Sequence, residues 1–516
     1  MLCCYNGRRL QDRPPGSNTQ SKKLTLDNKP VDIAAKFKPL FDPRSVAFLG
    51  ASSDPRKWGF RILFNLINGG FPGRIYPVNP KQEEILGLRV YKNVGDIPEI
   101  PDLAVIVVPP QSVPHVVKEC VDKGMKAGVV VTAGFAEVGE AGEKLQRETV
   151  EIARSGGMIL VGPNSFGIVN APGKLYSQMP PIFPPPGPIA LISQSGNVVG
   201  TVGRLAMTKG FGSSKGISSG NEADLHSEDY LEYLGDDPQT KVILSYIEGF
   251  KDGSRFFQTA KEVSKKKPIV MLKAGETLAG ARAAKSHTAS LAGSDPMTEA
   301  LCKQAGIIRV RSLDELVDAG LAFLCHPLPQ GRRVGIVTAG GGWGVLAADS
   351  CAKLGLEVVS LPEQTLAELD SLLPAWWNRG NPVDLVAGAF GDAMIKCVEA
   401  LLRCPAVDGV IMLMIMPALP QELFARTSAE HNREEGRNAL LAAIIGIFDR
   451  LAKLASTHQK PVIVGSELPF GSAGLTADIT RALGQMNSVC YDMPHQAVAA
   501  FATLAQYSEY LRQDRA

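Results

Sequence analysis

Short apolar runs alternate with turns and amphipathic segments along most of the chain, starting near residue 40. Runs such as Ser45–Gly50, Arg74–Val78 and Leu103–Val108 have the length and apolar character of buried strands. Segments with helical spacing lie between them, for example at 59–68. Strands that alternate with helices are typical of parallel sheets covered by helices. We therefore predict an α/β protein built from consecutive doubly wound domains.

Changes in this pattern divide the chain into segments. Residues 1–34 are mostly polar with an excess of arginine and lysine, and we predict a disordered extension there. The alternation then predicts three domains, at 35–180, 188–315 and 331–510. Six prolines at 180–188 predict a stiff linker between the first two domains, because proline resists both helix and sheet pairing.

The second and third predicted domains resemble each other in sequence. Each opens with a strand, a turn of small residues and a helix, at 193–200 and 338–345. Each also contains a similar later turn, Gly220–Leu225 in one and Gly380–Leu385 in the other. Two copies of one fold explain this similarity, and so does a functional pair of turns that face phosphate.

Bulk composition excludes several classes of function. Lysine and arginine number 54 against 52 acidic residues, so the charge gives no indication of nucleic acid as a partner. The longest apolar run, Val410–Met416, is too short to span a bilayer. The nine cysteines form no CxxC pair, and the chain shows no secretory signal. We therefore expect a reducing, cytoplasmic location and no membrane partner.

Three predicted strands of the first domain end in turns that suit a nucleotide-like ligand. The first turn reads GASSDP instead of GxGxxG, and the second strand ends without the acidic residue that would hold the ribose of NAD. This argues against a nicotinamide dehydrogenase and tolerates a phosphorylated ribose. A glycine turn alone is weak evidence, but three strand ends together favour a ligand at the switch point. The candidate residues are Gly50, Ala51, Ser52, Asn79, Pro80, Lys81, Val108 and Pro109.

Two further turns stand where a strand leads into a helix. Backbone N–H groups and the helix dipole favour an anion at such a position, and small residues allow close approach. Ordinary tight turns of an α/β fold are the alternative for either one. The candidate phosphate-binding residues are Ser195, Gly196, Asn197, Gly341 and Gly342.

His287 lies in a stretch made mostly of small residues. Residues 274–294 read AGETLAGARAAKSHTASLAGS and follow a buried-strand pattern at 268–273. Such a stretch builds little core and suits a mobile segment, and a neutral imidazole can take a phosphoryl group and hand it on. A surface loop with an incidental histidine is the alternative.

Glu248 stands in YIEG, at the end of another predicted strand. A carboxylate in this place can hydrogen-bond an imidazole, fix its tautomer and stabilise its cation. A surface glutamate without a role is the alternative. No GxSxG motif follows a strand, which argues against a serine hydrolase.

Six motifs occur in the order known from one family. They are GASSDP (50–55), GPNSFG (162–167), SQSG (193–196), YIEG (246–249), SHT (286–288) and GGGWGV (340–345). Over about residues 40–500 the chain resembles the NDP-forming acyl-CoA synthetases, which are similar to succinyl-CoA synthetase. More narrowly, it resembles the α subunits of ADP-forming acetyl-CoA synthetases. This implies a Rossmann-like CoA-binding domain followed by two flavodoxin-like, succinyl-CoA synthetase-like domains.

The resemblance also implies roles for the candidate residues. His287 would be the phosphorylated histidine and Glu248 its partner carboxylate, with the turns at Ser195 and Gly341 holding phosphate. The strand-end residues of the first domain would line the CoA site, and Asn164 would lie near the thiol and the acyl group. No metal site is expected in this chain.

The implied reaction is reversible: acyl-CoA, ADP and phosphate give acid, CoA and ATP through an acyl phosphate and a phosphohistidine. ATP or ADP and Mg²⁺ would bind an ATP-grasp module, which we do not find in this sequence, so we expect a separate β subunit and a hetero-oligomer. A non-catalytic CoA-binding regulatory or scaffold protein is the alternative. It has no need of the SHT motif, Glu248 and both glycine turns.

Overall fold

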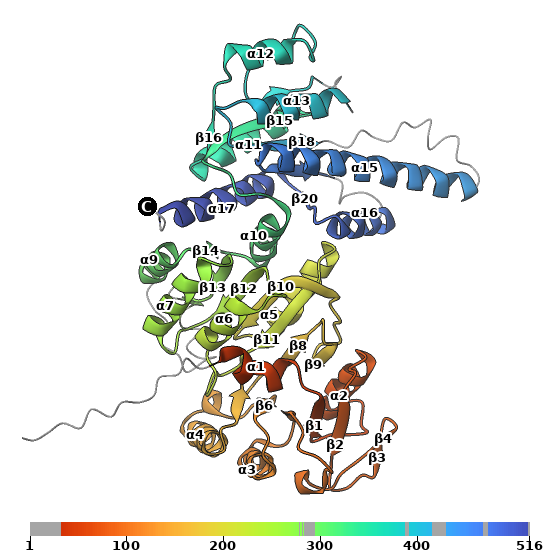
Figure 1. The fold of residues 1–516 in the computed structure, drawn as a ribbon, viewed down its shortest axis with the longest axis vertical. Coiled ribbons are helices and arrows are strands. Elements are labelled where there is room, and N and C mark those ends of the chain that lie inside the picture. Colours follow the sequence, from red (N-terminus) through yellow and green to blue (C-terminus); the bar gives the residue numbers. More distant parts are fainter. Residues whose placement is uncertain are drawn as a thin grey trace, which may run out of the picture.

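The structure is a computed structural model that describes residues 32–277, 279–280, 282, 295–386, 392–414, 430–467 and 473–513. Figure 1 shows three helix-covered sheets stacked along the long axis of the molecule, in the order of the chain. The parallel strands of each sheet follow the order 2-1-3-4-5, counted within that sheet and leaving out β17 of the third sheet. This is the doubly wound, flavodoxin-like order, and it confirms the predicted fold class.

The first sheet has five parallel strands in the order β2-β1-β5-β6-β7. Every residue of its central strands β1, β5 and β6 is buried, as expected for strands covered by helices on both faces. The order reverses beside β1, so a crevice is expected outside the carboxyl ends of β1 and β5. The elements are α1 (Ile33–Phe41), β1 (Ser45–Leu49), α2 (Trp58–Asn68), β2 (Arg74–Val78), β3 (Glu84–Ile85), β4 (Leu88–Arg89), β5 (Leu103–Ile106), α3 (Val113–Lys123), β6 (Ala127–Val130), α4 (Glu140–Ser155) and β7 (Ile159–Val161).

The second sheet has seven strands in the order β14-β13-β12-β10-β11-β8-β9. Strands β10 to β14 are parallel, whereas β8 pairs antiparallel with β11 and with β9. The elements are β8 (Gly167–Asn170), β9 (Leu175–Gln178), β10 (Pro186–Ser193), α5 (Gly196–Thr208), β11 (Ser213–Ser218), α6 (Ser227–Asp236), β12 (Val242–Ile247), α7 (Gly253–Ser264), β13 (Ile269–Lys273), α9 (Asp295–Ala305), β14 (Ile307–Val310) and α10 (Leu313–Cys325).

The third sheet has the order β16-β15-β18-β19-β20, and β17 pairs with β15 on the same side as β16. The elements are β15 (Arg333–Thr338), α11 (Gly341–Lys353), β16 (Glu357–Val358), α12 (Glu363–Asp370), β17 (Val383–Asp384), α13 (Asp392–Arg403), β18 (Gly409–Met414), α15 (Glu430–His458), β19 (Val462–Ser466), α16 (Ala473–Gln485), β20 (Cys490–Tyr491) and α17 (Pro494–Gln513).

The junction between the first two domains differs from the prediction. The sequence pattern assigned residues up to 180 to the first domain, but β8 and β9 hydrogen-bond into the second sheet through β11. The proline-rich segment 180–188 therefore connects two strands of one sheet, and its last residues belong to β10. Antiparallel pairing with a strand far along the chain leaves no local signature, which is why the pattern could not show it.

The start of the first domain also differs from the prediction. Ile33 and Ala34, assigned to the extension, are the first residues of α1, and Asp32 caps this helix by accepting a hydrogen bond from the Ala35 N–H (3.0 Å). The rest of the predicted extension lies outside the described residues.

Helix α1 joins the first and second domains. The rings of Phe37 and Phe41 stack on Tyr233 of α6, with ring centroids 4.8 and 5.0 Å apart. Lys36 forms an ion pair with Asp229 of the same helix at 3.7 Å. The core of the first domain therefore continues into the second.

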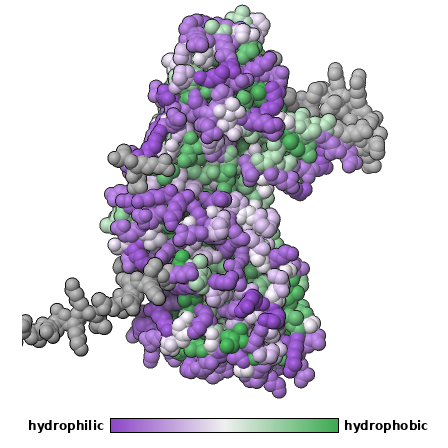
Figure 2. All heavy atoms as spheres, in the orientation of Figure 1, coloured by the Kyte–Doolittle hydropathy of each residue, from purple (hydrophilic) through white to green (hydrophobic). Residues whose placement is uncertain are grey.

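The second and third domains share a core along α10 and α17. Helix α17 packs on both α10 and α11, and buried side chains of both sheets meet there. Figure 2 shows a largely hydrophilic face with an apolar band at the level where α10 and α17 lie in Figure 1. Lys209 adds ion pairs to Asp318 (3.5 Å) and Asp492 (3.6 Å). Among the described helices, none is long and apolar enough to cross a membrane.

Candidate functional site

The first turn of the first domain is folded tightly against its neighbours. Gly50 has a φ of +90°, and a Cβ there would lie 2.2 Å from the Val107 carbonyl oxygen. A Cβ on Gly59, in the first turn of α2, would lie 2.1 Å from the Gly50 oxygen. Only glycine allows both approaches. The turn at the carboxyl end of β1 therefore packs closely against the chain after β5 and against the start of α2.

Asn79 connects this turn to the end of β2. Its Nδ2 donates to the Ala51 carbonyl (2.7 Å), and its Oδ1 accepts from the Lys81 N–H (2.8 Å). The Ser52 hydroxyl accepts from the Asp54 N–H at 3.1 Å, which fixes the far side of the first turn. The structure thus brings the predicted residues of these two strand ends together at one sheet edge.

Two basic side chains beside this edge, Arg56 and Lys57, were missed by the sequence reasoning, whereas Lys81 was among the predicted residues. Arg56 and Lys57 follow the first turn directly, and both are exposed, as is Lys81. Arg56 forms an ion pair with Asp54 at 3.0 Å. Hydrogen bonds donated by the Arg56 side chain and backbone lower the pKa of the Asp54 carboxyl. Lys57 is the N-cap of α2 and makes no side-chain capping bond. The Arg-Lys pair after GASSDP was the available signal, because a phosphate-rich ligand needs cations.

The GPNSFG loop fills the seam between the first and second domains. Asn164 has a φ of +59°, and its N–H donates to the Thr132 carbonyl at 2.9 Å. The Thr132 hydroxyl in turn donates to the Val108 carbonyl at 2.6 Å. On the other side, a Cβ on Gly220 would lie 2.3 Å from the Pro163 oxygen. Asn164 therefore lies between the predicted CoA edge and the loop after β11.

Asn221 holds that seam together, and the sequence reasoning gave it no role. Its Oδ1 accepts from the Asn164 Nδ2 (3.3 Å), and its Nδ2 donates to Glu137 (2.5 Å) and to Gln146 (3.0 Å). Burial raises the pKa of the Glu137 carboxyl, but hydrogen bonds from Asn221 and the Gly134 N–H outweigh it and leave the pKa lowered. An ionised carboxylate thus fixes the Asn221 amide beside Asn164.

Glu248 is buried at the carboxyl end of β12, with 6% of its surface exposed. Its N–H donates to the Gln194 Oε1 (2.7 Å), and its carbonyl accepts from the buried Lys273 ammonium (2.8 Å). Burial and the neighbouring Glu248 raise the pKa of Tyr246 to about 12. The surface alternative for Glu248 does not hold, because strands β10, β12 and β13 enclose it.

Glu222 links the Glu248 strand end to the seam. It accepts hydrogen bonds from the hydroxyls of Ser219 (2.8 Å) and Ser227 (2.5 Å), and it also interacts with the Gln194 amide. Complete burial raises its pKa above the ordinary range for a glutamate. Through Gln194, the loop after β11 and the backbone at Glu248 are therefore positioned together.

The helix starts of the second and third domains have matching geometry. The Ser193 hydroxyl donates to the Ser195 carbonyl (2.7 Å) and accepts from the Ser195 N–H (3.1 Å). The Thr338 hydroxyl makes the same two bonds with Gly340, at 2.7 and 3.2 Å. Ser195 and Gly340 are the N-caps of α5 and α11. The predicted repeat is thus present in three dimensions at these two turns.

The second pair of matched turns was misaligned in the prediction. In the strand register, Ser193 pairs with Ser218, and Thr338 pairs with Asp384. The residue two beyond each partner has a positive φ, +59° at Gly220 and +50° at Val386. Gly220 therefore corresponds to Val386 and not to Gly380, because β16 and β17 together take the place of β11.

Different groups face the two helix starts. A Cβ on Gly196 would lie 2.0 Å from the ring of Phe166, whereas a Cβ on Gly341 would lie 3.0 Å from the Asp384 carboxylate. Asn197, Gly341 and Gly342 are exposed or nearly so. The Asp384 carboxylate thus lies near the N-terminus of α11, and its negative charge disfavours a second anion there. Phosphate binding at either turn stays a prediction.

His287 lies outside the described residues, but the segments on either side of it converge on Arg309. This arginine of β14 has 6% of its side chain exposed and forms ion pairs with Glu276 (3.0 Å), Asp295 and Glu299 (2.9 Å). Glu276 is the third residue of the 274–294 stretch that contains His287, and Asp295 follows its last residue. An arginine inside a buried strand was the sequence signal that our reasoning passed over.

Three family models match successive parts of the chain. They are a CoA binding domain at 44–171, a succinyl-CoA ligase like flavodoxin domain at 186–323 and a ligase-CoA domain at 334–446. Together they cover the seam, the two helix starts and the Glu248 strand end.

Curated relatives match over most of the chain. The α subunit of acetate–CoA ligase [ADP-forming] II from Pyrococcus furiosus is 40% identical over 472 residues, which is 91% of this chain and 97% of the relative. The α subunit of form I from the same organism is 43% identical, over 80% and 90%. Acetate–CoA ligase [ADP-forming] from Methanocaldococcus jannaschii is 45% identical, but the match covers only 50% of that longer protein.

A solved structure agrees with the fold. It is the structure of dinucleotide forming acetyl-coenzyme A synthetase 1 of Ca. Korarchaeum cryptofilum in complex with phosphate and ADP. The two structures superpose with a TM-score of 0.80 at 35% identity, covering 93% of this chain and 99% of that one.

Proposed function

Because this chain belongs to the ADP-forming acetate–CoA ligase family and matches its α subunits over most of its length, we propose that it is the α subunit of an acyl-CoA ligase. The observation that supports this most is a path of contacts across the seam. It runs from the Val108 strand end through Thr132 and Asn164 to Asn221. From the adjacent Glu222 it continues through Gln194 to the backbone N–H of Glu248.

We place the CoA at the carboxyl edge of β1, β2 and β5. The Gly50 turn lets a ligand approach the backbone there, and Arg56, Lys57 and Lys81 supply positive charge for its phosphates. The thiol end would then point along the seam toward Asn164. The amide of Asn164, held by Asn221, would then orient the acyl group.

The proposed reaction of acyl-CoA, phosphate and ADP has three steps. Phosphate attacks the thioester carbonyl and releases CoA as its thiol, which gives an acyl phosphate. His287 then takes the phosphoryl group from the acyl phosphate and releases the carboxylic acid. ADP finally takes the phosphoryl group from phosphohistidine and gives ATP. In our proposal the Glu248 carboxylate stabilises the imidazolium form of His287, and the Glu248 backbone is fixed by hydrogen bonds to Gln194 and Lys273.

The nucleotide and Mg²⁺ belong in our proposal to an ATP-grasp β subunit. The described residues contain no cluster of side chains that could hold a metal ion. A partner surface is available beside the Gly341 turn, where Val345 and Leu346 of α11 are 63% and 58% exposed. We infer a hetero-oligomer in a reducing cytoplasm, which suits the free thiols of all seven described cysteines.

Phosphorylation of His287 tests the proposal. The chain is incubated with the β subunit of its genomic neighbourhood, Mg²⁺ and labelled ATP, and the label should be acid-labile and base-stable. The His287→Ala variant should carry none. Equal labelling of the variant, or no acid-dependent release of ADP with any of a panel of carboxylic acids and CoA, would favour the non-catalytic CoA-binding alternative.

The docking surface is tested separately from the chemistry. A charge introduced by Leu346→Asp should prevent co-purification with the β subunit, because a carboxylate would be buried without a partner. Met297→Asp on α9 is the matched control, since Met297 is 68% exposed and lies on another helix. Equal loss of binding in both variants would remove α11 from the docking surface.

A further inference from the structure

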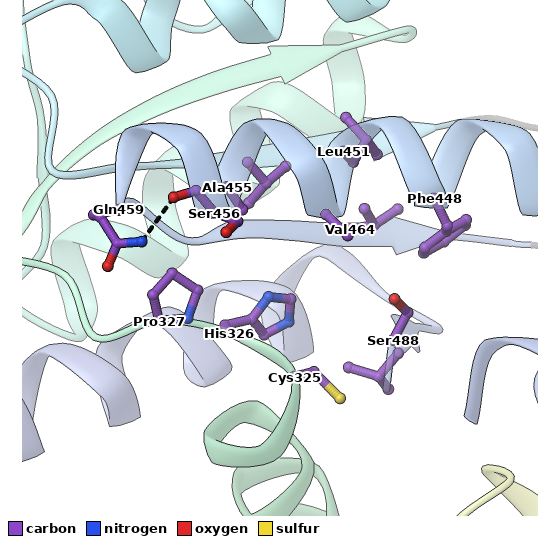
Figure 3. Close-up of a pocket in the computed structure, with 13 residues that line it drawn as sticks. Cys325, His326, Pro327, Phe448, Leu451, Ala455, Ser456, Gln459, Val464 and Ser488 are labelled. Carbon is purple, nitrogen blue, oxygen red and sulfur yellow. Dashed lines mark hydrogen bonds between the residues drawn. The ribbon is translucent and has the colours of Figure 1, made fainter. Parts of the chain in front are cut away.

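A cavity of about 210 Å³ lies where the chain passes from the second domain to the third. It lies between residues 325–327 on one side and α15 and the strand β19 on the other, as Figure 3 shows, and it is partly open to solvent. An engineered apolar cavity of about 150 Å³ is large enough to take up benzene. The space is therefore large enough for a ring-sized molecule and lies apart from the seam described above.

The walls of the cavity are mostly apolar. Phe448, Leu451 and Ala455 of α15 face it, together with Val464 of β19. Its polar lining consists of His326, Ser456, Gln459 and Ser488, with the thiol of Cys325 beside them. None of the lining residues is an acid, a lysine or an arginine. A charged ligand would thus lose its hydration without gaining an ionic partner.

His326 lines this space and carries a buried polar atom without a partner among the described residues. It ends α10, where its N–H donates to the Ala322 carbonyl at 3.1 Å. In Figure 3 its ring points from the linker toward α15. The ring Nε2 is buried and has no hydrogen-bond partner among the described residues. Burial lowers the pKa of His326 to about 4, so the ring is neutral near pH 7.

A buried ring nitrogen without a partner is rare in a folded protein. A neutral imidazole nitrogen either donates or accepts, according to its tautomer. A hydroxyl group can serve both cases, because it carries one donor hydrogen and two acceptor lone pairs. The apolar walls would contact the rest of such a ligand.

We propose that this cavity binds a small uncharged molecule with a ring-sized apolar body and a single hydroxyl group, which hydrogen-bonds to His326. The molecule contacts the linker on one side and α15 on the other. Its binding therefore stabilises the junction between the second and third domains by mass action. This is a second ligand site, separate from the CoA edge and from the Glu248 strand end.

Phenol, toluene and benzoate are the probes, titrated into the intact chain by isothermal calorimetry. Phenol should bind at one site, about fivefold more tightly than toluene, which lacks the hydroxyl. Benzoate has the same ring with a charge, and it should bind more weakly than either. Phenol should also raise the melting temperature of the chain, because it binds only the folded state.

Two variants locate the binding. Ala455→Leu places three more carbons in the cavity and should abolish phenol binding, whereas Ala443→Leu on the exposed side of α15 should leave it unchanged. His326→Phe keeps a ring of similar size without the nitrogen, so phenol and toluene should bind it equally. Thermal unfolding of each variant shows that it is folded.

Three results would overturn the proposal. The first is no saturable binding of phenol or toluene, which would mean that water alone fills the space. The second is phenol binding that Ala455→Leu leaves intact, which would place the site elsewhere. The third is a preference of folded His326→Phe for phenol over toluene as large as that of the unaltered chain.

Discussion

The second and third domains begin alike and then diverge in what surrounds the start of their first helix. Ser193 and Thr338 close their turns with the same pair of hydrogen bonds, to within 0.1 Å. The α5 start then meets the Phe166 ring, whereas the α11 start meets the Asp384 carboxylate. The turn is thus a shared scaffold, and neighbouring loops decide its chemistry.

The residues that follow Ser193 and Thr338 also differ between the two domains. Gln194 in the second domain holds the backbone of Glu248, whereas Ala339 in the third domain has no side chain that could do so. The N–H groups of both residues nevertheless donate to equivalent strand ends, at Tyr246 and Leu413. Two residues after Tyr246 the sequence has Glu248, whereas two residues after Leu413 it has Ile415. Of these two domains, as far as the structure describes them, only the second therefore combines this kind of helix start with a buried carboxylate at the neighbouring strand end.

The segment after the fourth parallel strand differs as well. Residues 274–294 separate β13 from α9 and contain His287, whereas residues 467–472 separate β19 from α16. The longer segment is bounded by Glu276 and Asp295, which share Arg309. We infer that the second domain carries the phosphoryl chemistry and that the third carries structural and docking roles.

The largest expected effect comes from Glu248→Gln. Loss of a group that orients and charges an imidazole costs on the order of a hundredfold in rate. Phosphoryl transfer should slow by about that factor, while CoA affinity measured by calorimetry stays nearly unchanged. Asp384→Asn, at the α11 start, should leave the transfer rate nearly unchanged. Equal effects of the two substitutions would erase the distinction between the domains.

Gly196→Ala should destabilise the fold by about 1–3 kcal/mol, since the new methyl group overlaps the Phe166 ring. Gly342→Ala is the matched substitution at the other helix start, where a Cβ meets nothing within 4 Å. It should have no measurable cost. Urea unfolding of both variants measures the difference, and comparable losses would show that the two helix starts are equally crowded.

Arg309→Met should cost about 1–2 kcal/mol, because it leaves three carboxylates that are only partly exposed without their shared cation. It should also slow His287 phosphorylation, because the ends of the His287 segment are no longer held together. Arg311→Met, at an exposed position two residues on, is the control for both measurements. Normal phosphorylation in folded Arg309→Met would limit this arginine to stability.

The smallest expected effects come from removing the Ser193 and Thr338 hydroxyls, which hydrogen-bond to the backbone at the two helix starts. Ser193→Ala and Thr338→Val each remove one buried hydroxyl that makes two backbone hydrogen bonds, and each should cost about 1 kcal/mol. Equal unfolding losses would support one shared scaffold. A loss confined to one domain would show that the two turns are held differently.

The amino-acid sequence by itself determined the parts of the fold that depend on neighbours along the chain. The run Arg74–Val78 predicted β2 with its observed bounds, and the longest apolar run, which starts at Val410, begins one residue inside β18 (Gly409–Met414), because a buried parallel strand is almost continuously apolar. Glycine at position 50 likewise marked a turn that no other residue could make. The ordered motifs identified the family, which the curated relatives confirm.

Tertiary structure alone decided the features that join distant segments. The placement of β8 and β9 in the second sheet depends on antiparallel pairing with β11, and the repeat alignment depends on strand register. The burial of Glu248, the Asn221–Glu137 bridge and the Arg309 cluster each unite residues from separate elements. The pattern of apolar residues indicates which face of a helix or strand is buried. Hydrogen bonds and ion pairs between residues far apart in the sequence depend on how the helices and strands pack.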